Sequence, residues 1–197
     1  EDRGYLGYLS RRRPAPALWT DLANGRPAAV RFWYRQRPRP LVPRFSSPWL
    51  VELRVSLLNP PPYQQGMTSM SLDTQGRLLE FLSIPERLLD PSIEIPSPHP
   101  EPTWEIVFAE AGLDARDWKP ASPIWSPPVP CDHQSAWTGA YKEDPGLPIR
   151  LEACERRGQI IAFTILAPWN LPVQVQAGTP LSAQILFWLS WAFHVGI

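Results

Sequence analysis

The 197-residue sequence has few cysteines, few methionines and no excess of charge of either sign. It contains two Cys and two Met, and its 19 Lys+Arg balance 19 Asp+Glu. Two Cys exclude a disulfide scaffold, although they allow one bridge. A zero net charge argues against a general nucleic-acid-binding protein, which needs a basic surplus to neutralise phosphates. We therefore expect no nucleic-acid partner.

The motifs of several enzyme classes are also absent. No GxGxxG or Walker-type loop is present to bind nucleotide phosphates, and no GxSxG sequence presents a nucleophilic serine. The three His (His99, His133 and His194) lack the paired spacing of metal ligands. No spacing selects a catalytic pair among the scattered acids, which include Glu52, Asp73, Glu80, Asp132 and Glu152. The sequence therefore predicts no catalytic residue, no metal site and no cofactor.

Proline and tryptophan, in contrast, are abundant. The 26 Pro are about 13% of the residues, against a usual ~5%. This density disfavours long helices and central strands and favours short strands joined by extended connections. Ten Trp, within 44% apolar residues, supply a stiff core. We therefore expect a folded chain rather than a disordered one.

Two hairpins give the clearest local signals. Residues 66–85 contain two strand-like runs around Asp73-Thr74-Gln75-Gly76, and residues 149–166 contain two more around Arg157-Gly158. Alternation of apolar residues predicts further strands at 29–36, 49–58 and 135–141.

Helical segments precede the strands in each half of the chain. Short helical pieces are predicted within residues 5–25, and Thr103 is predicted as the N-cap of a helix that ends near Gly112. The fold class is therefore α+β, with two tandem helix-plus-antiparallel-sheet subdomains followed by an apolar C-terminal helix. Each unit is small, so we expect the two to share a core or pair edges. One continuous antiparallel sheet with helices on one face is the alternative.

Composition sets the predicted boundaries. The first subdomain covers 1–90 and is truncated at its N-terminus, a Pro-rich linker covers 91–102, and the second subdomain covers 103–172. Residues 180–197 carry no charge from Leu181 onward and are predicted to begin a transmembrane helix. A buried C-terminal helix of the domain is the alternative.

A basic and aromatic strip is the candidate ligand site. Trp33, Arg35, Arg37 and Arg39 lie in the Pro-punctuated stretch FWYRQRPRP. Such a strip fits an anionic or peptide ligand, whereas packing of Arg side chains on aromatic rings is the structural alternative. Eleven Arg and four acids in residues 1–54 also allow a basic patch for anionic lipid or polymer.

Cys131-Asp132-His133 is the one stretch that suggests nucleophilic chemistry, because a thiolate nucleophile needs a histidine base. It leaves open a cell-envelope enzyme or binding protein that uses Cys131 and His133. A loop without catalytic function is the alternative.

The same region bears on the two cysteines. A hairpin of residues 135–155 that turns at 144–147 places Ala136 opposite Cys154. Cys131 then lies about five residues farther on, roughly 17 Å away at the rise of a strand. A disulfide needs Cα atoms within about 7 Å, so we expect Cys131 and Cys154 to remain unbonded.

Several stretches carry a family resemblance. They are FWYRQRPRPL, NPPPYQQGM with SLDTQGRLLEF, AEAGLDARDWKPASPIWSPP, and PIRLEACERRGQIIAF followed by APW, and they cover most of residues 17–170. This combination resembles the extracytoplasmic segment of a group of bacterial membrane-spanning serine/threonine protein kinases. In those proteins a kinase domain and membrane helices precede the segment, and further membrane helices follow it. The hairpins after short helices also resemble PepSY or cystatin-like units.

The resemblance implies a role without catalysis, because the kinase motifs themselves (the Gly-rich loop, the VAIK lysine, HRD and DFG) are absent. We expect a non-catalytic extracytoplasmic sensory or interaction module of a membrane serine/threonine kinase-like protein. Its partner would be a small molecule, a peptide or an envelope protein, and its C-terminal apolar segment would enter the membrane. A structural spacer between membrane helices and the cell-envelope enzyme are the alternatives.

Overall fold

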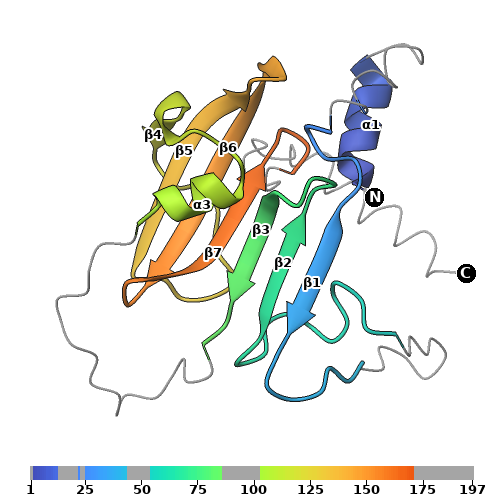
Figure 1. The fold of residues 1–197 in the computed structure, drawn as a ribbon, viewed down its shortest axis with the longest axis vertical. Coiled ribbons are helices and arrows are strands. Elements are labelled where there is room, and N and C mark those ends of the chain that lie inside the picture. Colours follow the sequence, from blue (N-terminus) through green and yellow to red (C-terminus); the bar gives the residue numbers. More distant parts are fainter. Residues whose placement is uncertain (1, 13–21, 23–24, 44–53, 86–102, 171–197) are drawn as a thin grey trace, which may run out of the picture.

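A computed structural model describes residues 2–12, 22, 25–43, 54–85 and 103–170 (Figure 1). Seven antiparallel strands form one sheet in the order β1-β2-β3-β7-β6-β5-β4. The strands are β1 (Phe32–Gln36), β2 (Thr68–Leu72), β3 (Leu78–Ser83), β4 (Lys119–Ala121), β5 (His133–Tyr141), β6 (Asp144–Arg156) and β7 (Gln159–Leu166). The helical elements are α1 (Arg3–Arg12), α3 (Glu105–Glu110) and the short 3-10 helix η1 (Ala115–Asp117).

The described chain is a mixture of helix and antiparallel sheet, as the sequence predicts. Strands β1–β3 come from the first predicted subdomain and β4–β7 from the second. The two sets meet where β3 pairs with β7, with Glu80 opposite Thr164 and Leu82 opposite Ala162. The sheet therefore runs without a break through both segments of the chain (Figure 1).

Both predicted hairpins are confirmed. In the β2–β3 turn, one carboxylate oxygen of Asp73 accepts hydrogen bonds from the backbone N–H groups of Gln75 and Arg77, at 2.8 and 2.9 Å. Gly76 has φ +78°, which a residue without a side chain adopts at little cost. Arg157 and Gly158, at φ 54° and 74°, form the two-residue turn between β6 and β7. Local turn chemistry thus fixes both hairpins.

Three local predictions are wrong at the level of single elements. The described part of the predicted strand 49–58, residues 54–58, is a loop. Thr103 is not the N-cap, because α3 begins at Glu105 and Trp104 occupies the cap position without a side-chain cap bond. The turn before β6 lies at Lys142 and Glu143 rather than at residues 144–147, which β6 itself includes.

The core has two layers, one on each side of the sheet. Tyr5 and Tyr8 of α1 pack on Trp169, each at 4.8 Å between ring centroids, and α3 contributes Val107 and Phe108. Residues of both helices therefore pack against the same core layer. The buried residues of that layer are Val107, Phe108, Ala111, Trp118, Tyr141, Leu147, Ile149, Leu151, Ala153, Phe163 and Ala167. The opposite layer consists of Leu82, Ile84, Val129, Cys154, Ile161 and Ala162.

A disulfide joins Cys131 to Cys154, with 5.8 Å between the Cα atoms, which corrects the expectation of unbonded cysteines. Gln134, rather than Ala136, lies opposite Cys154, so only three residues separate Cys131 from that position. The chain then folds back, and the N–H of Asp132 donates to the carbonyl of Glu155 at 2.9 Å. A bonded sulfur cannot act as a thiolate, so in this form Cys131 does not supply the nucleophile that the alternative of a cell-envelope enzyme requires.

Several predicted segments lie outside the described residues. These are the apolar segment 180–197, the linker 91–102 and, within the stretch 5–25 predicted to be helical, residues 13–21 and 23–24. Within the described ranges, no helix combines the length and apolarity needed to cross a membrane.

Candidate functional site

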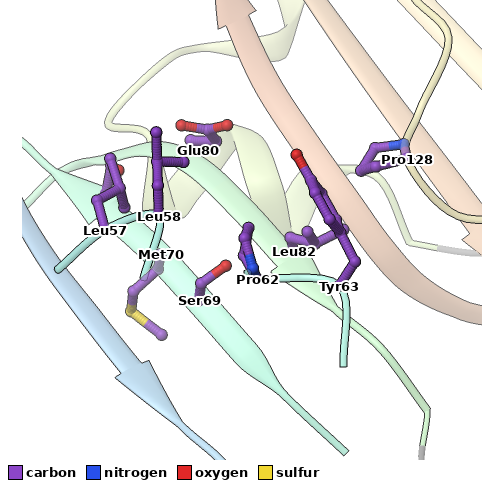
Figure 2. Close-up of a pocket in the computed structure, with 10 residues that line it drawn as sticks. Leu57, Leu58, Pro62, Tyr63, Ser69, Met70, Glu80, Leu82 and Pro128 are labelled. Atoms are coloured by element: carbon purple, nitrogen blue, oxygen red, sulfur yellow. The ribbon is translucent and has the colours of Figure 1, made fainter. Parts of the chain in front are cut away.

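A hollow of about 110 Å³ lies on the sheet face opposite the helices, over β2 and β3 (Figure 2). On its floor, β2 contributes two polar side chains, and β3 contributes one charged and one apolar side chain. Ser69 and Ser71 of β2 lie opposite Leu82 and Glu80 of β3, so the four side chains share one face. Ser69 and Ser71 are 9% and 3% exposed and line the hollow, so they form part of its floor.

The walls of the hollow are apolar. Leu57, Leu58, Pro62 and Tyr63 come from the loop between β1 and β2, and Pro128 approaches from the loop between β4 and β5 (Figure 2). Tyr63 and Leu58 remain 58% and 68% exposed at the rim. The hollow therefore combines a polar floor with apolar sides, which is the general character of a small-ligand site.

Arg35 of β1 fixes the wall in place. Its side chain is buried, and its guanidinium donates to the carbonyl oxygens of Ser56 at 2.6 Å and Pro60 at 2.5 Å and to the sulfur of Met67 at 3.0 Å. Burial lowers the pKa of Arg35, but a guanidinium remains charged in proteins. This residue therefore holds residues 56–60 over the sheet and does not contact the open hollow.

Among the described residues that line the hollow, Glu80 is the acidic one, and its side chain remains exposed to solvent. Partial desolvation by the surrounding protein raises the pKa of its carboxyl group, and the positive charge of Arg31 opposes that shift. Arg31 is not a direct partner, because its guanidinium pairs with Asp2. Within the described ranges, Glu80 makes no hydrogen bond or ion pair of its own.

The predicted strip of Trp33, Arg35, Arg37 and Arg39 divides among three environments. Trp33 is 44% exposed and lies opposite Ser71, beside the hollow. Arg37 donates to the carbonyl oxygen of Arg39 at 3.0 Å and also to the side chain of Gln64. Arg37 and Arg39 line a separate hollow of about 310 Å³. The structure thus gives Arg35 a packing role, while ligand binding by the other three stays a prediction.

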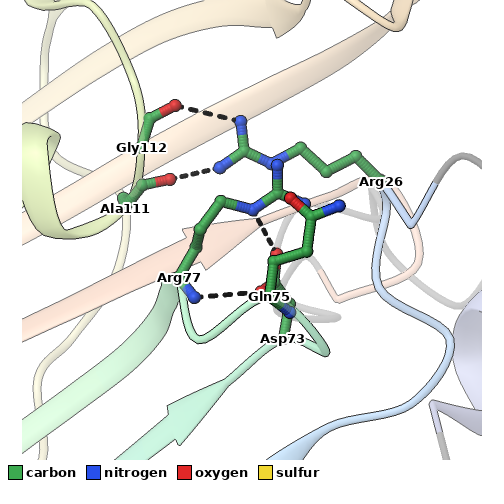
Figure 3. Close-up of polar contacts among 6 residues, drawn as sticks. All are labelled: Arg26, Asp73, Gln75, Arg77, Ala111 and Gly112. Carbon is green, nitrogen blue, oxygen red and sulfur yellow. Dashed lines mark hydrogen bonds and ion pairs between the residues drawn. The ribbon is translucent and has the colours of Figure 1, made fainter.

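A second buried polar cluster ties the two halves of the chain together (Figure 3). Arg26 donates to the carbonyl oxygens of Ala111 and of Gly112, the latter at 3.1 Å, at the end of α3. Arg77 pairs with Asp73 at 2.5 Å in the β2–β3 turn. Burial, followed by the nearby charge of Arg77, lowers the pKa of Arg26. Among the described residues, Arg26 contacts backbone carbonyl groups and the ring of Tyr141, so we interpret this cluster as structural.

Sequence reasoning missed the residues that form the floor of the hollow. The alternation in TSMSL places Ser69 and Ser71 on one face, and LLEFL contains a single acid among apolar residues. These two signals become informative only when the register of β2 and β3 is known. Neither stretch by itself shows that Ser71 lies opposite Glu80. Among the described residues, no group of His, Cys, Asp or Glu side chains is arranged to hold a metal ion.

Comparison of the chain with protein-family models, with curated proteins and with solved structures gives no match.

Proposed function

We propose that the chain is a non-catalytic extracytoplasmic sensory or interaction module of a membrane serine/threonine kinase-like protein. The observation that carries the binding role is the hollow over β2 and β3, whose wall is held by a buried arginine. A loop pinned in this way forms a site before any ligand arrives, which lowers the ordering cost of binding.

The disulfide supports the extracytoplasmic side. Structural disulfides persist in oxidising compartments and are rare in the reducing cytosol. Cys131 and Cys154 link the loop before β5 to the second core layer. A chain that relies on this link for its packing is best suited to the outer side of the cell membrane.

The finer architecture belongs to the same proposal. We infer that segments 1–90 and 103–172 are two related units of the PepSY or cystatin-like kind, joined edge to edge through β3 and β7. Each supplies a helix and at least three strands, which supports that relation. The apolar segment 180–197 would begin the membrane helix that transmits a change in packing to the rest of the protein.

The first test is the complete reading frame on both sides of residues 1–197. We expect a kinase domain upstream and membrane-spanning helices on both flanks. A secretion signal upstream and a soluble domain downstream would contradict the kinase link.

The second test is a parent protein that lacks residues 30–170. A sensory module predicts that the kinase retains basal activity but no longer responds to its stimulus. A response that survives this deletion would support a structural spacer and overturn the sensory role.

A further inference from the structure

The hollow over β2 and β3 contains an acid without a counter-charge of its own. The carboxylate of Glu80 lines the hollow, and the cation that acts on it most, Arg31, is already paired with Asp2. Glu80 lies opposite Thr164 of β7, and Thr164 lies opposite Glu152 of β6. Glu152 already has a partner, because it forms an ion pair with Arg150. The charge of Glu80 is therefore available to a group that enters from solvent.

The floor beside Glu80 supplies further acceptors. Ser71 lies directly opposite Glu80 in the β2–β3 pair, and Ser69 follows two residues along the same face. A serine hydroxyl offers two acceptor lone pairs, and a carboxylate accepts only. A primary ammonium group carries three N–H donors and no acceptor. The three side chains thus match the hydrogen-bonding pattern of an ammonium group.

The size and walls of the hollow restrict the rest of such a ligand. Its volume of about 110 Å³ is well below the ~300–1,000 Å³ of sites for drug-sized molecules. Leu57, Pro62, Leu82 and Pro128 surround the space next to the polar floor (Figure 2). A short aliphatic chain would bury its surface there without leaving a polar group unpaired.

We propose that this hollow binds a small alkylammonium ion, with its ammonium group at Glu80 and Ser71 and its short chain against Leu57 and Leu82. The proposal rests on the proposed binding function and names the chemical class of the ligand. A neutral alcohol of the same length would fill the same space but would leave the carboxylate without a cation.

The surroundings of Glu80 add a pH dependence. Partial desolvation raises the pKa of this carboxyl, and a bound cation favours its ionised form and so lowers that pKa. By linkage, binding is weak when the carboxyl is neutral and strengthens as the pH rises through its pKa. Arg31 is the charged neighbour whose positive charge opposes the rise in the pKa of Glu80.

The experiment is a titration of the ¹⁵N-labelled 197-residue chain with n-butylammonium chloride, followed by amide chemical shifts at constant ionic strength. A parallel titration uses 1-butanol, the neutral molecule of equal length. The variants are Glu80→Gln, which removes the charge but keeps the shape, and Glu110→Gln, an exposed site on α3 as the matched control. Amide spectra before titration verify that each variant is folded.

We expect saturable shifts at Ser69, Ser71 and Glu80 with a dissociation constant of roughly 1 mM for butylammonium. Glu80→Gln should weaken butylammonium binding at least ~10-fold, 1-butanol should bind at least ~10-fold more weakly, and Glu110→Gln should have no effect. Equal binding of 1-butanol, together with no effect of Glu80→Gln, would overturn the cation assignment and leave the hollow as a binding site. Absence of shifts at these amides with either molecule would overturn both this proposal and the binding role of the hollow.

Discussion

The guanidinium of Arg35 in β1 donates to the carbonyl oxygen of Pro60 at 2.5 Å, across a loop of 25 positions. A second bond from the same group reaches Ser56. Residues 56–60 do not pair with a strand within the described residues. The buried guanidinium of Arg35 holds this loop to the sheet by bonding two of its carbonyl groups. The wall of the hollow thus depends on one side chain of the sheet.

Replacement of Arg35 by Ala should lower the free energy of unfolding by about 2–3 kcal/mol, because one buried and one partly buried carbonyl lose their donor. Urea unfolding followed by tryptophan fluorescence measures this. Arg39→Ala is the matched control, since the Arg39 side chain is exposed and only its backbone carbonyl accepts from Arg37. Its effect should stay within ~0.5 kcal/mol. Equal effects of the two variants would contradict the anchoring role of Arg35.

Reduction of the Cys131–Cys154 disulfide should lower stability by about 3 kcal/mol, because it releases a loop constraint over a sequence separation of 23. Urea unfolding with and without dithiothreitol gives the difference. The double variant Cys131→Ser/Cys154→Ser should match the reduced chain and show no response to dithiothreitol. If dithiothreitol does not change the unfolding midpoint of the wild-type chain, the disulfide does not contribute to its stability.

Asp73→Ala should destabilise the chain by about 2–4 kcal/mol. The carboxylate is 1% exposed, caps two backbone N–H groups of its turn and pairs with Arg77 at 2.5 Å. Its loss leaves a mostly buried guanidinium unpaired. Thr74→Ala, at an exposed position of the same turn, should change stability by less than ~0.5 kcal/mol in the same denaturation assay. Similar losses of stability in Asp73→Ala and Thr74→Ala would contradict the role of the Asp73 carboxylate in the turn.

Gly139→Ala should cost about 1–3 kcal/mol through overpacking. A Cβ added at Gly139 would lie 2.8 Å from the indole of Trp118, which packs in the helix-side core. Gly146→Ala is the control, because the nearest atom to its added Cβ is 3.8 Å away. Thermal unfolding of both variants should show a lower Tm for Gly139→Ala alone. An unchanged Tm at Gly139 would mean that Trp118 moves at no cost.

Tyr141 should make the chain sensitive to alkaline pH. Burial raises its pKa to about 12 despite the opposing charges of Arg26, Arg31 and Arg77. Between about pH 10 and 12 the unfolded chain releases this proton and the folded chain keeps it, so unfolding becomes easier as the pH rises. Stability measured across this range should fall less steeply in Tyr141→Phe. Identical slopes would show that Tyr141 does not contribute.

The sequence alone determined the two hairpin turns, where backbone preferences within a few residues decide the local structure. The β2–β3 and β6–β7 turns follow from Asp73 and Gly76 and from Arg157 and Gly158, because backbone preferences and side-chain caps act within a few residues. The α+β class likewise follows from helical segments that precede alternating runs. These features need no knowledge of distant contacts.

Tertiary structure decided the remaining features. The Cys131–Cys154 bond depends on a hairpin register that differs by two residues from the one expected. The hollow depends on the alignment of Ser71 with Glu80 and on a loop held by Arg35. The disulfide and the hollow each bring together residues that are far apart in the chain. Only the pairing of the strands in the folded sheet determines which of these residues come into contact. Local preferences limit the conformations of each segment, but burial and pairing across the sheet select the one in which a polar floor lies under apolar walls.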